Sequence, residues 1–72
     1  MKLTREQLDE QVDKFYEEAM EAFPGFFVPT EILLKNCPEA DEQSQAKFDA
    51  IVKNDSRFKR ANWGGVYQAN YM

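Results

Sequence analysis

The chain has 72 residues, which is enough for one domain, and its nine basic and thirteen acidic residues give a net charge of −4. Hydrophobic residues make up 43% of the chain, too many for a disordered tail. The apolar run Phe26–Val28 is far too short to cross a membrane, and no apolar signal region follows Met1 and Lys2. We therefore expect a small globular domain in the cytoplasm.

The chain contains one cysteine, Cys37, and no histidine. A single cysteine excludes an internal disulfide, and the composition excludes a Cys/His zinc site. Serine or cysteine catalysis that depends on a histidine base is excluded as well. We therefore expect a binding protein that is not an enzyme and that needs no cofactor.

The first predicted helix covers about residues 5–22. Thr4 and Gln7 have the spacing of a capping box, and Leu3 and Leu8 have that of a hydrophobic staple. Apolar residues then recur at every third or fourth position, namely Leu8, Val12, Phe15, Ala19 and Phe23. Pro24 and Gly25 end the helix.

Two shorter helices are predicted next. Pro29 suits the first turn of a short helix that ends at residues 36–38. A third helix is predicted over about 42–54, with Asp41 or Ser44 as its N-cap. Its buried face is marked by Phe48, Ile51 and Val52.

The C-terminal part predicts a β-hairpin. Residues 57–61 form the outgoing strand, residues 62–65 the turn, and residues 66–71 a return strand with Tyr67, Ala69 and Tyr71 on one face. A short extra strand is expected near Phe27. We expect Phe58 and Tyr67 to anchor the hairpin against Phe48, Ile51 and Leu33. The predicted fold class is α+β, mainly helical, with three helices followed by a C-terminal β-hairpin.

This element order is that of a winged helix, and one segment makes the resemblance more specific. The residues that carry it are Asp55, Arg57, Phe58, Gly65 and Tyr67. They resemble the end of the HARE-HTH type of winged helix, a family that includes the N-terminal domain of the RNA polymerase delta subunit. The second helix here is very short, and the long acidic tail of the delta subunit is missing. The resemblance implies a role in transcription and RNA polymerase as a partner.

Charge is unevenly distributed along the chain. Residues 1–42 contain four basic and eleven acidic residues, whereas residues 43–72 contain five basic and two acidic ones. The candidate nucleic-acid contacts are Lys47, Lys53, Arg57, Lys59, Arg60 and Trp63. The alternative is an ordinary solvated hairpin in which Trp63 packs on the first helix. Gln43, Ser44, Gln45 and Lys47 are further candidates for reading base edges, although polar residues at a helix start are more often caps.

Acidic residues follow one face of the first helix. They are Glu6, Glu10, Asp13, Glu17 and Glu21, and their spacing places them opposite the apolar stripe. Such a face either keeps the helix solvated or docks on a basic partner.

The function expected from these features is binding without catalysis. The preferred hypothesis is a small protein, such as a phage-encoded one, that binds RNA polymerase and modulates transcription with a basic wing near DNA or RNA. One alternative is a dimeric winged-helix regulator that binds DNA at its own operator. Another is an inhibitor whose acidic helix occupies a basic groove of a host enzyme.

Overall fold

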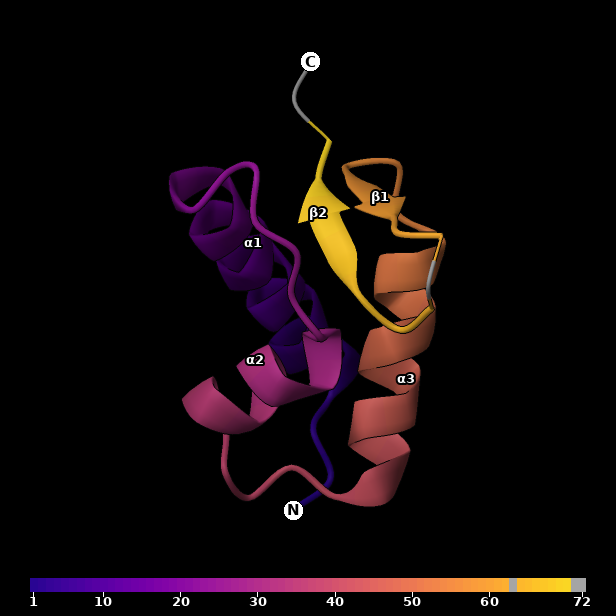
Figure 1. The fold of residues 1–72 in the computed structure, drawn as a ribbon. Coiled ribbons are helices and arrows are strands. Elements are labelled where there is room, and N and C mark those ends of the chain that lie inside the picture. Colours follow the sequence, from indigo (N-terminus) through magenta and orange to yellow (C-terminus); the bar gives the residue numbers. More distant parts are fainter. Residues whose placement is uncertain (63, 71–72) are drawn as a thin grey trace.

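The computed structural model describes residues 1–62 and 64–70. Its elements are α1 (Arg5–Glu21), α2 (Pro29–Asn36), α3 (Glu42–Lys53), β1 (Phe58–Arg60) and β2 (Tyr67–Ala69) (Figure 1). The predicted α+β class, mainly helical with three helices before an antiparallel hairpin, is confirmed. The first and third helices each end one residue earlier than predicted. None of the helices in the described ranges is both long and apolar enough to span a bilayer.

Local signals set the beginning of α1. The Thr4 hydroxyl accepts a hydrogen bond from the Gln7 backbone at 3.1 Å, and the Gln7 side chain accepts one from the Thr4 backbone at 2.8 Å. Leu3 and Leu8, on either side of this capping box, are both buried. The predicted capping box is therefore confirmed, and it satisfies amide donors that the first helical turn would otherwise leave free.

A third extended segment, around Phe27, pairs with the hairpin. In β1 and β2 the paired residues are Phe58 with Ala69, Lys59 with Gln68, and Arg60 with Tyr67. On the other side of β2, Phe27 and Tyr67 exchange two backbone hydrogen bonds of 2.8 and 2.7 Å. The extended segment near Phe27 is thus confirmed, and β2 lies between it and β1. Tyr71, predicted to continue the return strand, lies outside the described residues.

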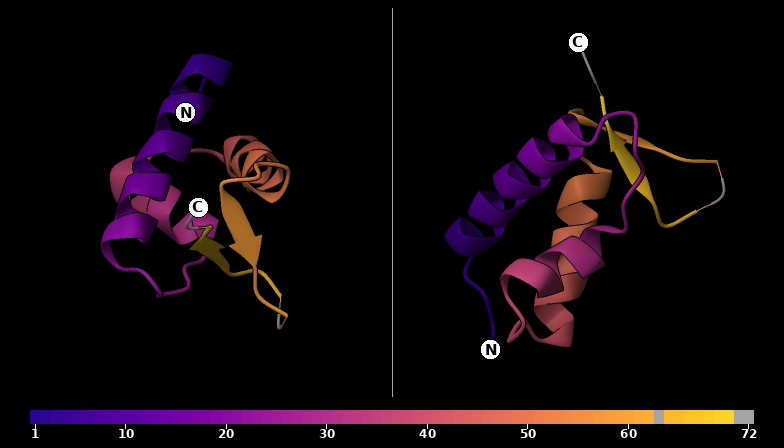
Figure 2. Two further views of the ribbon diagram at one scale, coloured as in Figure 1. Left: turned by 90° about the horizontal axis from the view of Figure 1, so that it is seen from above. Right: turned by 60° about the vertical axis from the view of Figure 1, so that its left-hand side comes forward.

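The described residues on either side of the hairpin turn extend away from the helices (Figure 2). Gly64 and Gly65 both have a φ of 69° there. This left-handed conformation costs glycine little and strains other residues, which explains the glycine pair at this turn.

The core lies where the three helices meet the hairpin. Phe15, Leu33 and Phe48 contribute one fully buried side chain from each helix. The Phe58 ring stacks on Phe15, with the centroids 4.9 Å apart, and meets the edge of Tyr16 at 5.8 Å. The prediction that Phe58 anchors the hairpin against α2 and α3 therefore missed its aromatic contacts, which are with α1.

Candidate functional site

Arg57, a predicted nucleic-acid contact, is engaged within the chain. Its guanidinium donates to Asp55, with Nη2 2.8 Å from Oδ2, and to Asp13 on α1, with Nη1 3.0 Å from Oδ1. It also lies over the Tyr16 ring, 5.2 Å from the centroid. These bonds hold the pKa of Asp55 below its usual value and raise that of Arg57 further. We therefore assign Arg57 a structural role and leave it out of the contact surface.

The other predicted basic residues are exposed on two different elements. Lys47 and Lys53 lie on α3, whereas Lys59 and Arg60 lie on β1. In the described part of the chain, none of these four cations forms an ion pair. Each is therefore available to an anionic partner. Trp63 lies outside the described residues.

Two of the predicted base-reading residues at the start of α3, Ser44 and Gln45, serve the fold, whereas Gln43 is exposed. Ser44 is only 1% exposed, and its hydroxyl accepts a hydrogen bond from the Leu3 backbone at 2.8 Å. The Gln45 side chain donates to the Ala40 carbonyl at 3.1 Å. Asp41 is the N-cap, since its carboxylate accepts from the Ser44 backbone. The prediction that Ser44 reads base edges is therefore wrong, because a buried side chain cannot reach a groove of DNA. The Gln45 side chain is held by its hydrogen bond to the turn before α3.

The predicted acidic face of α1 is exposed along its length. Its members Glu6, Glu10, Asp13, Glu17 and Glu21 are all solvent-accessible. Asp13 is bound to Arg57, whereas the four glutamates have no ion-pair partner among the described residues. Glu18, which lies off this face, is bound by Lys35 and Asn36, and their hydrogen bonds lower its pKa. The four glutamates are therefore the free part of the face.

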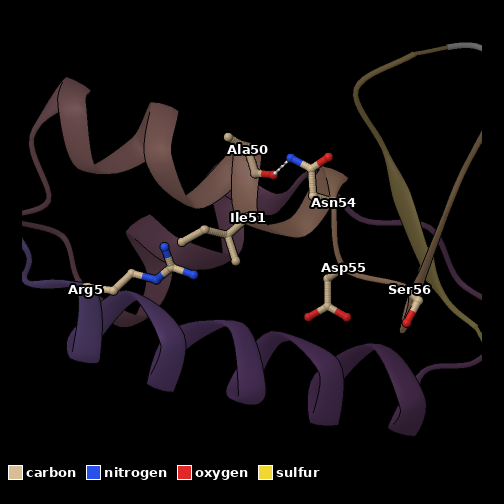
Figure 3. A pocket seen from close by; sticks show the side chains of 6 residues that line it. All are labelled: Arg5, Ala50, Ile51, Asn54, Asp55 and Ser56. Atoms are coloured by element: carbon tan, nitrogen blue, oxygen red, sulfur yellow. Dashed lines mark hydrogen bonds between the residues drawn. The ribbon is translucent and has the colours of Figure 1, made fainter.

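A hollow of about 570 Å³ separates the start of α1 from the end of α3 (Figure 3). Ile51 and Ala50 line its middle, Arg5 lies at one end and Asp55 at the other (Figure 3). Both charges are already paired, Arg5 with Asp9 and Asp55 with Arg57. Asn54 and Ser56 line it as well, so the hollow presents a largely polar surface whose two charges are already engaged.

A smaller hollow lies beside the basic hairpin, and the sequence did not reveal it. About 200 Å³ in volume, it is lined by Phe26, Lys59, Arg60, Ala61 and Asn62. Phe26 comes from the connection between α1 and α2 and is 42% exposed. Its neighbour Phe27 packs against the core instead. Because successive side chains of an extended segment face opposite ways, the strand predicted near Phe27 was the one signal that could have placed Phe26 outside.

The described residues contain no group of three or more Asp, Glu, Cys or His side chains arranged to hold a metal ion. Cys37 is a free, half-buried thiol. Comparison with family models, curated proteins and solved structures finds no match to the chain.

Proposed function

We propose that the chain is a non-enzymatic winged-helix domain of the cytoplasm that docks on RNA polymerase and holds its basic hairpin near nucleic acid. The observation that carries this proposal is the separation of two unpaired sets of charges. Glu6, Glu10, Glu17 and Glu21 of α1 form one set, and Lys59 and Arg60 on β1 form the other. The two sets would meet partners of opposite charge.

The arrangement of the elements supports the fold assignment. Three helices are followed by a hairpin whose last strand also pairs with a segment between the first two helices. This arrangement resembles a winged helix, as the residues from Asp55 to Tyr67 do. Fold resemblance by itself does not define a function, and for that reason the proposal depends on the charged surfaces.

The acidic face suits a protein partner better than it suits nucleic acid. Glu10 and Glu17 are separated by seven positions, so they lie on the same side of α1, two turns apart. Unpaired carboxylates in such a row attract a basic protein surface and repel phosphates. Docking through α1 would leave the hairpin free for a second contact.

Operator binding has less support. Sequence readout by α3 would need side chains that reach base edges, and Ser44 and Gln45 are held within the fold. The net charge of −4 also opposes tight binding to duplex DNA. We therefore propose that the hairpin makes a local contact with nucleic acid, and that this contact is not the main source of binding affinity.

The test is binding to purified bacterial core RNA polymerase. The double variant Glu10→Lys/Glu17→Lys should bind about tenfold more weakly or worse, chiefly through slower association. The control Glu31→Lys/Glu39→Lys makes the same change of charge at exposed residues outside α1 and should bind like the wild type. Equal losses in the two variants, or no binding of the wild type, would contradict the proposal. So would nanomolar, sequence-selective binding to duplex DNA alone.

A further inference from the structure

The small hollow beside the hairpin combines an aromatic ring with two cations. Phe26 supplies the ring, and Lys59 and Arg60 supply the charges. Its remaining lining residues, Ala61 and Asn62, are uncharged, so no described residue of the lining opposes an anion. The local charge is thus positive although the chain as a whole is acidic.

The pairing of the strands explains why two of these groups, the Phe26 ring and Lys59, share one surface. Phe27 pairs with Tyr67, and Tyr67 pairs with Arg60 across β2. Phe27 packs on the core, so Phe26, one position earlier, is directed to the outer face. Lys59 and Gln68 are paired one position from Arg60 and Tyr67, so they lie on this outer face too. Phe26 and Lys59 are therefore brought to the same side by three short extended segments.

The size of the hollow limits what it can hold. Its volume of about 200 Å³ is below the roughly 300–1,000 Å³ of pockets that enclose a whole small molecule. One flat ring on Phe26, with its attached phosphates outside against the cations, matches both the volume and the charge. Bases of unpaired strands stack on aromatic side chains in this way, whereas bases within a duplex are covered by their neighbours.

We propose that this hollow binds an unpaired nucleotide of single-stranded DNA or RNA, with the base stacked on Phe26 and the flanking phosphates bound by Lys59 and Arg60. Asn62 supplies an amide at the rim for a base edge or a phosphate. The inference deepens the proposed function and rests on its premise that the hairpin faces nucleic acid. It adds the strand state of the ligand and a residue outside the hairpin.

The experiment measures fluorescence anisotropy of a labelled oligothymidylate of about twelve nucleotides, within the roughly 4–16 nucleotides that such sites cover. The full chain is titrated at low salt against this strand, an abasic strand of equal length, and a duplex. The wild type should bind the oligothymidylate about fivefold or more tightly than the abasic strand, since stacking accounts for that ratio. It should also prefer the oligothymidylate to the duplex.

Substitutions measure the contributions of the Phe26 ring and of the two cations to binding separately. Phe26→Leu should weaken binding about fivefold or more, and Phe26→Tyr should retain it. The matched control is Phe23→Leu, which changes a ring of similar exposure (46%) that does not line the hollow. Lys59→Gln/Arg60→Gln should weaken binding and reduce the salt slope by about 1.4, because each released phosphate contact contributes about 0.7 on a single strand. Lys2→Gln/Lys14→Gln removes the same charge from exposed lysines elsewhere and should change little.

Three outcomes would overturn the inference. The first is equal affinity for the oligothymidylate and the abasic strand, which would leave a contact with phosphates alone. The second is equal behaviour of Phe26→Leu and Phe23→Leu in variants whose circular dichroism matches the wild type. The third is equally tight binding of an acidic peptide of the same charge, which would indicate a protein ligand. No polymerase is present in the assay, so its failure is distinguishable from a failure of docking through α1.

Discussion

Arg57, directly before β1, donates from Nη1 to Oδ1 of Asp13 on α1, 3.0 Å away and 44 positions earlier in the chain. The same guanidinium holds Asp55, two positions before it, through Nε and Nη2. The two carboxylates differ in environment, since the Asp13 side chain is 66% exposed and that of Asp55 is 19% exposed. Arg57 thus links the start of β1 to the first helix through the exposed Asp13, and its second partner is the partly buried Asp55.

The first prediction is that these two carboxylates contribute unequally to stability. Asp13→Asn should lower the free energy of unfolding by less than about 1 kcal/mol, because an exposed ion pair is screened by water. Asp55→Asn should lower it by about 1.5–3 kcal/mol, the usual contribution of hydrogen bonds to a charged group. Urea denaturation at neutral pH measures both. Equal losses would mean that the difference in burial does not matter here.

The second prediction concerns acid. Hydrogen bonds from Arg57 lower the pKa of Asp55 from its ordinary value of 3.8. A carboxylate with a lowered folded-state pKa contributes stability above the unfolded-state value, and this contribution is lost as the pH falls through the folded-state value. The wild type should therefore lose stability below about pH 4, and Asp55→Asn should lose less over the same interval.

Urea midpoints between about pH 5 and pH 2 test this acid limb. Some loss should remain in Asp55→Asn, because the pKa values of Asp41 and Glu18 are lowered too, by the Ser44 amide and by Lys35 with Asn36. Parallel pH curves for the wild type and the variant would show that Asp55 has the same pKa in the folded and unfolded chains.

The fold was predictable from the sequence where its causes are local. The capping box needs only Thr4 and Gln7, and the hairpin only a change from helical to alternating period. The link between Arg57 and Asp13 is different, because nothing in the sequence pairs residues from distant elements until the core has brought α1 to the hairpin. For the same reason α1 was missed as the aromatic partner of Phe58.

The candidate site divides in the same way. Exposed charges on α1 and β1 were predictable, since spacing alone separates the glutamates from the apolar stripe. Phe26 and Phe27 look equivalent in the sequence, and only the pairing of Phe27 with Tyr67 decides which ring is outside. The sequence left Ser44 as a candidate for base reading. The bond that excludes this role, to the Leu3 backbone, joins residues 41 positions apart and cannot be recognised from the sequence.

The third prediction is that Phe58 is indispensable to the hairpin. Phe58→Ala should cost about 3–5 kcal/mol, most of the stability of a small domain, because it removes a ring that is 8% exposed and stacks on Phe15. Phe23→Ala is the control, with the same substitution at a ring that is 46% exposed, and it should cost far less. Chemical denaturation of Phe58→Ala close to that of the wild type would show that the hairpin is peripheral to folding.

The last prediction concerns how the N-terminus is held against α3. The Ser44 hydroxyl accepts from the buried Leu3 backbone amide, and the Asp41 amide donates to the Met1 carbonyl at 2.9 Å. Ser44→Ala leaves the Leu3 amide without its acceptor, and an unsatisfied buried donor costs about 1–3 kcal/mol. Denaturation should show this loss, whereas the control Ser56→Ala alters an exposed hydroxyl and should stay within about 0.5 kcal/mol of the wild type.

Hydrogen exchange of the Leu3 amide gives a local readout of the same change. In Ser44→Ala this amide should exchange faster than global destabilisation alone requires, because residues 1–3 can then separate from α3 while the rest of the core stays folded. The Leu8 amide, bonded to the Thr4 carbonyl at 2.9 Å, serves as the internal reference. If the Leu3 and Leu8 amides kept their wild-type ratio of exchange rates, the Ser44 hydroxyl would not be what fixes the N-terminal segment.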